Sequence, residues 1–500
     1  MKATGFASAL LASTMLVGAA NANASDISIA ITEGITGYNP YANSAVLVGM
    51  TWCQVYGCLT RWDFEEGRFV PFLAEDIRPD GEKSWLVRLR DDWLRHNGDP
   101  LRSEDIVHSI DRTRSDPDSV SQASVHYIDR VEIVDDRTLR IHTTEPIATL
   151  PNYLATIQIT SKAIHDEHGA RDADRLHPYG AGPYRLVDLQ ADSHMVLERV
   201  DDHPLIGTEN PRRMIFRVMI EPEQRVTALA NGEIQLAQNI PPQLRDRVDS
   251  LGNASAKTVA SAEMMFLAMQ PTSAPFDDAR MRKAVCHAIN RDAIVSALLG
   301  DNATKLNGAV ADGQLGYRES AEEMQPFDPD RTRRLLEEVG YDGSPLVLQT
   351  PVGRYTSDRQ ISEAIVAMLQ DAGINAQLQT PEWPVLWSGV QAGNVEFYYM
   401  GRGNMLDPSP ALAQYFETGG SPRLKYSNPQ VDELLKRERV EFDLDLRRDL
   451  LADAMEAIVR DDAACFLWNH HIIWGVADSI AYEPSKGDRV NGWEIQLKGQ

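Results

Sequence analysis

The chain lacks the short motifs that mark the common nucleotide-binding enzymes and hydrolases. No glycine is followed by lysine, which excludes a P-loop, and neither His-Glu-x-x-His nor Gly-x-Ser-x-Gly occurs. His165 and His168 stand only three residues apart with no third ligand in view, and adjacent His470 and His471 on a strand would point to opposite faces. We therefore expect no enzymatic activity, no cofactor and no resident metal ion.

Positive charge is also in short supply. The 500 residues include 49 Lys and Arg against 73 Asp and Glu, a formal net charge of −24. Such a surface repels phosphate backbones, which argues against a nucleic-acid partner. An enzyme is the alternative to a non-catalytic protein: a secreted hydrolase that uses a pair of carboxylates. Pairs of acidic residues are too common in this sequence to indicate such an enzyme.

Long apolar runs are confined to the N-terminus. Residues 1–24 combine Lys2, an apolar run over 6–20 and the small-residue exit Ala22-Asn23-Ala24, the pattern of a cleaved secretory signal peptide. No later run approaches the ~20 residues that cross a bilayer. No cysteine stands at the cleavage position, so we expect a periplasmic protein without a lipid anchor.

The chain has only four cysteines, in a compartment where disulfides persist. Cys53 and Cys58 lie five residues apart, and we expect them to form a local disulfide. Cys286 and Cys465 would have to meet across the fold. A lone cysteine with apolar neighbours such as Cys286 is often just a small buried residue, so the sequence favours no second disulfide and leaves the pairing open.

The periodicity alternates between strands and helices, which predicts α/β lobes. We predict strands over 86–89, 138–142, 184–187, 195–198 and 346–352. Helices are predicted over 282–299, 330–339 and 362–372, each followed by a glycine where a helix ends. No repeat of 20–50 residues appears, which argues against a solenoid.

Seven segments carry a resemblance to a known family. The longest reads as a strand, a turn at Asn97-Gly98 and a helix that starts at Ser103 with acids in its first turn. The segments, in the family's order, are 55–63, 73–112, 180–186, 228–234, 274–291, 327–341 and 426–435. Together they resemble the extracytoplasmic solute-binding proteins of the peptide, opine and nickel ABC importers (family 5, dipeptide/oligopeptide-binding type).

This resemblance implies a periplasmic binding protein type II-like fold (cluster C), with two α/β lobes, a hinge and an extra domain. We expect a signal peptide over 1–24 and an extra domain II over 67–178. Lobe I would comprise 25–66, 179–268 and the C-terminal return over 471–500, and lobe III would comprise 269–470. The lobes are expected to close around the ligand by hinge motion.

The resemblance also places the ligand-binding residues. Arg354, followed by Tyr355, lies where relatives hold a ligand carboxylate, a group that suits the guanidinium fork. In the loop over 398–408, Asp407 aligns with a family aspartate. Asn404 stands where relatives pair a different aspartate with a peptide ammonium, and an amide cannot neutralise that charge. Either Asp407 or another acid takes over this role, or the solute has no such amine; the alternative for Asp407 is a turn residue before proline.

Aromatic residues are expected to supply the remaining contacts. Trp383 aligns near a cleft aromatic of relatives, although its four-residue spacing to Trp387 equally suits packing on a helix. Tyr38 and Trp52 fall in segments that border the cleft in similar proteins, and core packing is the alternative for each.

The function implied is the capture of a peptide, peptide-like or opine-like solute and its delivery to the permease subunits of an ABC transporter in the inner membrane, by a monomer. A metal chelate or haem cargo on the same fold is the alternative, with His470 or His471 as the contact.

Overall fold

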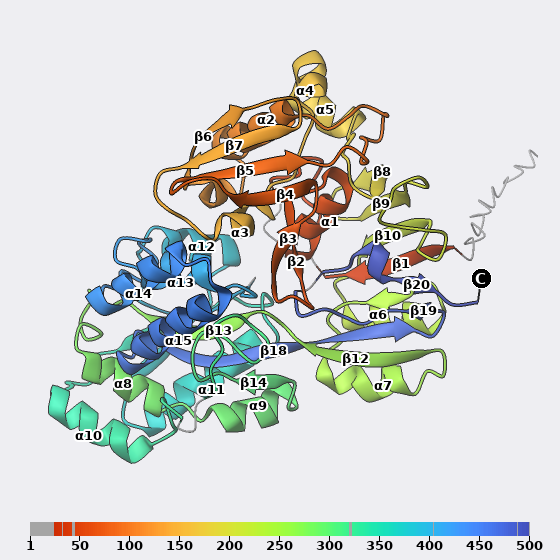
Figure 1. Ribbon diagram of the computed structural model, residues 1–500. Helices are drawn as coiled ribbons and strands as arrows, with labels where there is room; N and C mark the ends of the chain where they lie inside the picture. The colour runs from red at the N-terminus through yellow and green to blue at the C-terminus, as the bar shows by residue number, and fades with distance from the viewer. Residues whose placement is uncertain are drawn as a thin grey trace, which may run out of the picture.

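The computed structural model describes residues 25–32, 34–42, 46–319, 323–403, 405–487 and 489–499. The predicted leader over 1–24 lies outside these residues. The structure has three bodies, which we call lobe I, domain II and lobe III, and the long strand β18 (Ala464–Ala477) runs between two of them (Figure 1). It combines sheets with many helices, which confirms the expected α/β class.

Lobe I contains one half of a continuous sheet, in the order β8-β9-β10-β1-β11-β18, with β12 also paired to β18. Its strands are β1 (Asp26–Ile31), β8 (Tyr184–Gln190), β9 (His194–Arg199), β10 (Arg213–Val218), β11 (Leu236–Ala237), β12 (Ala254–Ala260), β19 (Ile480–Ala481) and β20 (Gln496–Leu497). Its helices are α1 (Val46–Tyr56), α6 (Pro222–Ala230), η2 (Pro242–Leu244), α7 (Arg245–Asp249) and η3 (Gly492–Glu494). A hairpin of β2 (Thr60–Asp63) and β3 (Arg68–Pro71) follows α1.

Domain II is built on a four-stranded antiparallel sheet in the order β4-β5-β7-β6. The strands are β4 (Ala74–Pro79), β5 (Ser84–Leu89), β6 (Ile128–Ile133) and β7 (Thr138–Thr143). Its helices are α2 (Ser103–Ser115), η1 (Gln122–Val125), α3 (Leu150–Leu154), α4 (Lys162–His168) and α5 (Ala170–Leu176). The predicted acids stand in the first turn of α2, and the Asp105 carboxylate accepts from the backbone N–H of Arg102 at 2.9 Å.

Lobe III contains the other half of the sheet, in the order β16-β15-β17-β13-β18, with β14 paired to β18. Its strands besides β18 are β13 (Met264–Met269), β14 (Ala303–Lys305), β15 (Leu346–Gln349), β16 (Ala376–Gln379) and β17 (Phe397–Arg402). Its helices are α8 (Ala279–His287), α9 (Arg291–Leu299), α10 (Pro329–Val339), α11 (Asp358–Asp371), α12 (Trp383–Gln391), α13 (Ser409–Phe416), α14 (Pro429–Val440) and α15 (Leu444–Arg460).

Strand β13 explains why lobe III has helices on both faces of its sheet. All six of its residues are buried, and alternate side chains join different cores. Met264 and Phe266 pack with α13 to α15, while Met265 and Leu267 pack with α8, α9 and α11. A strand that is apolar at every position, rather than at every second one, belongs in the middle of such a three-layer arrangement.

The helix predicted over 282–299 is wrong as a single element. α8 ends at His287 and α9 begins at Arg291, because the Asn290 side chain accepts from the backbone N–H of Ala293 and caps a new helix. The apolar residues keep a helical spacing across this break, so the sequence pattern did not reveal it. Gly300 ends α9 in the left-handed region with φ of 53°, as predicted.

The other predicted elements are found, with shifted ends. The strands predicted over 86–89, 138–142, 184–187 and 195–198 lie within β5, β7, β8 and β9, and the helix over 330–339 is α10. The strand predicted over 346–352 already ends at Gln349. The helix predicted to start at residue 362 starts at Asp358, because the preceding loop folds around the Asp358 carboxylate, as described below.

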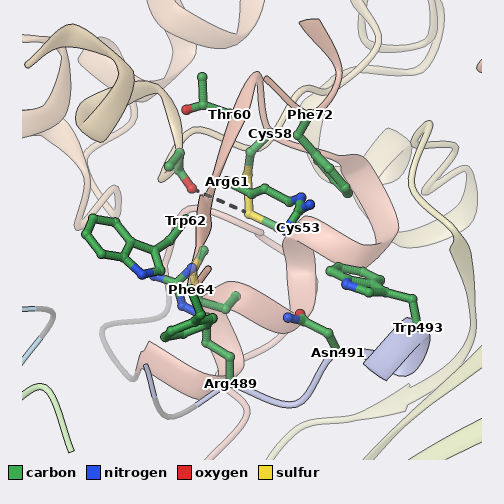
Figure 2. A pocket seen from close by; sticks show the side chains of 12 residues that line it. Cys53, Cys58, Thr60, Arg61, Trp62, Phe64, Phe72, Arg489, Asn491 and Trp493 are labelled. Atoms are coloured by element: carbon green, nitrogen blue, oxygen red, sulfur yellow. Dashed lines mark hydrogen bonds between the residues drawn. A yellow bond between two sulfur atoms is a disulfide. The ribbon is translucent and has the colours of Figure 1, made fainter. Parts of the chain in front are cut away.

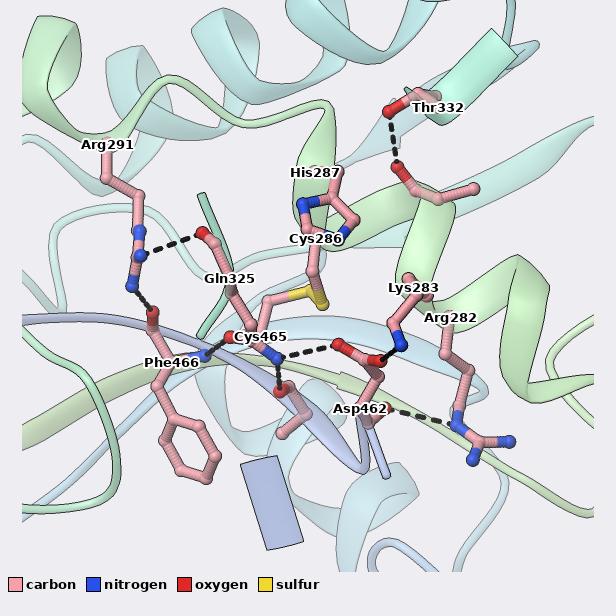
Figure 3. Close-up of a disulfide and its surroundings, with 12 residues drawn as sticks. Arg282, Lys283, Cys286, His287, Arg291, Gln325, Thr332, Asp462, Cys465 and Phe466 are labelled. Carbon is pink, nitrogen blue, oxygen red and sulfur yellow. Dashed lines mark hydrogen bonds and ion pairs between the residues drawn. A yellow bond between two sulfur atoms is a disulfide. The ribbon is translucent and has the colours of Figure 1, made fainter. Parts of the chain in front are cut away.

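All four cysteines form disulfides. The predicted Cys53–Cys58 pair is present, with 2.12 Å between the sulfurs. Cys286 also pairs with Cys465, at 2.03 Å, which settles the question that the sequence left open. This second bond ties α8 to β18, and the Gln325 side chain, bonded to the backbone of β18, lies beside it (Figure 3).

The two disulfides should differ in their effect on stability. Cys286 and Cys465 are 179 residues apart, whereas Cys53 and Cys58 are separated by five. A cross-link that closes a longer loop removes more entropy from the unfolded chain, so the Cys286→Ala, Cys465→Ala variant should lose about 2–5 kcal/mol of unfolding free energy. The Cys53→Ala, Cys58→Ala variant should lose less. Thermal and chemical unfolding measure both, and equal losses would contradict the loop-length argument.

Candidate ligand-binding site

Lobes I and III are joined at two neighbouring strand segments. β18 pairs with β13 through its first half and with β12 through its second half. Beside it, residues 261–263 connect β12 to β13. The Asn469 side-chain amide donates to the backbone carbonyls of Ser261 at 2.6 Å and Glu263 at 2.7 Å. The two segments that pass between the lobes, β18 and residues 261–263, are therefore hydrogen-bonded to each other where the lobes meet. We call these segments the two crossings.

An apolar cluster closes the space next to these crossings. Trp62 of the β2–β3 hairpin is only 4 % exposed and packs with Ala262 of the crossing and Leu406 of lobe III. Phe69 of β3 lies edge-on to Trp62, with 5.1 Å between ring centroids. Residues of lobe I and lobe III thus share one small core beside the crossings, and the lobes are in contact there.

The loop that carries Arg354 is held by a single carboxylate. Asp358, at the start of α11, accepts from the backbone N–H groups of Gly353 at 3.1 Å, Arg354 at 2.9 Å and Tyr355 at 3.0 Å. These three hydrogen bonds hold the loop backbone, while the Arg354 side chain is exposed. Its guanidinium lies 5.0 Å from the ring centroid of Trp383, a cation–π distance.

Tyr355 and Trp383 are the aromatic residues that contact the Arg354 side chain. Tyr355 lies edge-on to Trp383, at 6.4 Å, and to Tyr399 of β17, at 6.0 Å. Burial raises the pKa of the Tyr355 phenol, and the nearby Glu263 carboxylate raises it further. The phenol is neutral at physiological pH and donates to the backbone carbonyl of Gly401 at 3.4 Å. The structure thus brings Arg354, Tyr355 and Trp383 together.

Gly401 leaves room for this arrangement. A Cβ atom at this position would lie 2.4 Å from a Glu263 side-chain oxygen and 2.8 Å from a Tyr355 ring carbon. Tyr355 and Glu263 therefore occupy the space that a larger residue would need, which accounts for the glycine at this position. Asn404, in the same loop, lies outside the described residues.

Asp407 is occupied by protein partners. Its side chain is 3 % exposed and receives two hydrogen bonds from the Arg447 guanidinium, at 2.6 and 2.8 Å. Asn152 of domain II donates to the same carboxylate at 2.6 Å. Arg447 also pairs with buried Glu438 at 3.0 Å. Although burial opposes its charge, Asp407 and Glu438 raise the pKa of Arg447, while burial raises the pKa of Glu438.

A second group of contacts joins domain II to lobe III beside Asp407. The Arg439 guanidinium pairs with Glu145 of domain II at 3.2 Å and with Glu417 of lobe III. The Arg439 carbonyl accepts from the backbone N–H of Ala148 at 2.6 Å. Arg439 and Asp407 therefore mark a polar interface that bridges the two bodies rather than a free anionic site for a ligand ammonium.

Tyr38 and Trp52 lie in lobe I, in a different core from the Arg354 group. Trp52 is completely buried in α1, and its ring centroid is 5.8 Å from that of Tyr56. Tyr38 packs at the edge of the same core and donates to the backbone carbonyl of Leu189 at 2.8 Å. In this structure both residues support lobe I.

The pocket beside the Cys53–Cys58 disulfide is too small for a peptide. Figure 2 shows it on lobe I, lined among others by Arg61, Trp62 and Arg489. It leaves about 30 Å³, room for about two water molecules. The candidate site is instead the Arg354 group on lobe III, where Arg354, Tyr355 and Trp383 meet.

The two adjacent histidines lie on β18 near the crossing between the lobes. His470 is buried, which lowers its pKa to about 4, and His471 hydrogen-bonds to the Thr304 hydroxyl at 2.8 Å. Among the described residues, no group of three or more His, Cys, Asp or Glu side chains is placed to hold a metal ion. None of the described helices is long and apolar enough to span a membrane.

Two residues of the candidate site were not singled out from the sequence. Arg423 lies in the loop before α14, with its guanidinium 4.7 Å from the ring centroid of Trp387. Arg402 ends β17 within the loop region that the sequence did mark. No sequence spacing connects Arg402 or Arg423 to Arg354. The one feature that could have pointed to both is an arginine close to aromatic residues.

Replacing Asp407 separates a structural role from ligand binding. Breaking a buried ion pair leaves its partner charge uncompensated, so Asp407→Ala should lower the unfolding free energy by about 3–5 kcal/mol. The matched control is Asp445→Ala, which removes an exposed partner of Arg448 and should cost at most about 1 kcal/mol. Chemical unfolding measures both. An Asp407→Ala variant with wild-type stability and no ligand affinity would contradict the structural role.

The chain is similar to known bacterial solute-binding proteins over most of its length. A family model described as "Bacterial extracellular solute-binding proteins, family 5 Middle" matches residues 68–423. A glutathione-binding protein of Pectobacterium atrosepticum is 25 % identical over 468 residues, with 90 % of each chain covered. The dipeptide-binding protein of Escherichia coli is 24 % identical over 503 residues, covering 93 % of this chain and 91 % of that protein.

Solved structures agree on the fold. A periplasmic binding protein of Helicobacter pylori in complex with the peptide STSA is 19 % identical, with a TM-score of 0.81 and coverage of 95 % and 98 %. A Campylobacter jejuni protein in complex with Ni(L-His) is 18 % identical, with a TM-score of 0.79 and coverage of 95 % and 100 %. The fold is thus the expected periplasmic binding protein type II-like architecture. Since the family model covers well over half of the chain, the protein belongs to the bacterial extracellular solute-binding proteins, family 5.

Proposed function

We propose that this protein captures a peptide or peptide-like solute, opines included, in the periplasm and delivers it, as a monomer without catalysis, to the permease subunits of an ABC importer. Arg354 carries the proposal. Its backbone is fixed by Asp358, its guanidinium lies over Trp383, and its side chain is exposed. A positioned guanidinium of this kind offers a carboxylate two parallel hydrogen bonds.

The names of the relatives support the same solute class. Proteins named for glutathione and for dipeptides align over most of this chain, and both ligands carry a carboxylate. The domain boundaries expected from the sequence, with lobe III over 269–470, place Arg354 and Trp383 in one lobe. Closure of the other bodies over lobe III would then surround the bound solute.

Arg354→Gln tests the assignment. Loss of a charge-assisted bidentate contact, worth about 1.5–3 kcal/mol, should weaken binding of small peptides roughly 10- to 100-fold. Isothermal titration calorimetry with dipeptides, tripeptides including glutathione, and opines measures the affinity. The control is Arg359→Gln, an exposed arginine five residues away that pairs with Glu363 at 2.9 Å. Unchanged affinity in Arg354→Gln would refute this role for the residue.

A further inference from the structure

Arg354, Arg402 and Arg423 are arginines of lobe III whose charges are not paired with a described acidic side chain. Arg354, Arg402 and Arg423 form no ion pair with any described residue, although most arginines of this chain do. The chain as a whole carries a formal charge of −24. Acidic groups are therefore abundant, yet no described carboxylate pairs with any of these three guanidinium groups.

Arg354 and Arg423 lie at the two ends of a pair of stacked indole rings. The Arg354 guanidinium is 5.0 Å from the Trp383 ring, and the Trp383 and Trp387 rings are stacked with centroids 5.5 Å apart. The Arg423 guanidinium lies 4.7 Å from the Trp387 ring. Both indoles stand on the N-terminal half of α12, which lies beside α13 in Figure 1. We call these four residues the arginine–indole row.

The backbone of Arg423, like that of Arg354, is held by side-chain hydrogen bonds. Its backbone carbonyl accepts from the Tyr398 hydroxyl at 3.0 Å and from the Gln270 amide at 3.0 Å. Its guanidinium also lies 5.7 Å from the Tyr415 ring. Neither the Arg354 nor the Arg423 guanidinium donates a hydrogen bond to another described residue. Aromatic rings cover their faces and leave the in-plane N–H groups for a ligand.

Arg402 adds a third charge near the Arg423 end. Its Nη1 donates to the Gly403 carbonyl at 2.8 Å, while its buried Nε has no partner among the described residues. Burial lowers the pKa of Arg402, Tyr415 counteracts this, and Arg423 lowers it further. A guanidinium that is desolvated and close to a like charge gains most from a bound anion.

We propose that the arginine–indole row selects solutes with two anionic groups, one bound by Arg354 and the other by Arg423 with Arg402. This inference rests on the proposed function and narrows its solute class to dicarboxylates with a chain that lies across the two indoles. An extended peptide advances about 3.5 Å per residue, so three or four residues with an acidic side chain at the N-terminal end span the row.

Matched peptides test the proposal by titration calorimetry. The probes are Glu-Ala-Gly and Glu-Ala-Ala-Gly, each compared with its N-terminal Gln counterpart, which has one carboxylate fewer. The wild-type protein should bind at least one Glu peptide at least tenfold more tightly than its Gln counterpart. Arg423→Gln should abolish this preference, because the Glu peptide loses the partner of its second carboxylate. Arg448→Gln, an exposed arginine on α15 paired with Asp445, should preserve the preference.

The outcomes distinguish this inference from the proposed function. Equal binding of Glu and Gln peptides by the wild type, or a preference that survives in Arg423→Gln, overturns the second anionic subsite and leaves peptide capture intact. If no peptide binds, native mass spectrometry of protein purified from the periplasm identifies the resident solute. A solute with two anionic groups supports the arginine–indole row, and one with fewer overturns it. A solute with no carboxylate overturns the proposed function as well.

Discussion

The continuity of β18 is the constraint on which the rest of this structure depends. This 14-residue strand pairs with β13 in one lobe and with β12 in the other. Asn469 bonds this strand to the second crossing at Ser261 and Glu263. Paired strands resist sliding but can twist, so relative motion of the lobes is confined to rotation about these two segments.

The contact between domain II and lobe III is built so that it can open. Arg447 and Asp407 both belong to lobe III, and their buried ion pair remains intact when the bodies separate. Opening breaks the Asn152 hydrogen bond, the Ala148–Arg439 backbone hydrogen bond and the Arg439–Glu145 pair, which together cost about 2–5 kcal/mol. A bound solute can supply free energy of this size, so ligand binding and closure are naturally coupled.

The sequence predicted the features that depend on local chemistry. Glycine-terminated helices such as α10 and the close Cys53–Cys58 pair follow from spacing, and ordered motifs identified the fold. Contacts between distant residues could not be predicted in this way. Asp407 resembles a ligand residue in sequence, but its partners Arg447 and Asn152 are 40 and 255 residues away, and only the fold brings them together. The break at Asn290 was missed because apolar periodicity outweighed one capping residue.

Closure about β18 is tested most directly by a distance across the interface. Because all four native cysteines are in disulfides, spin labels at Asp118→Cys in domain II and Lys436→Cys on α14, both exposed positions, report the separation by double electron–electron resonance. The account predicts a distribution that includes long distances without peptide and narrows to one short distance with a saturating peptide. Identical distributions with and without a peptide that calorimetry shows to be bound would contradict it.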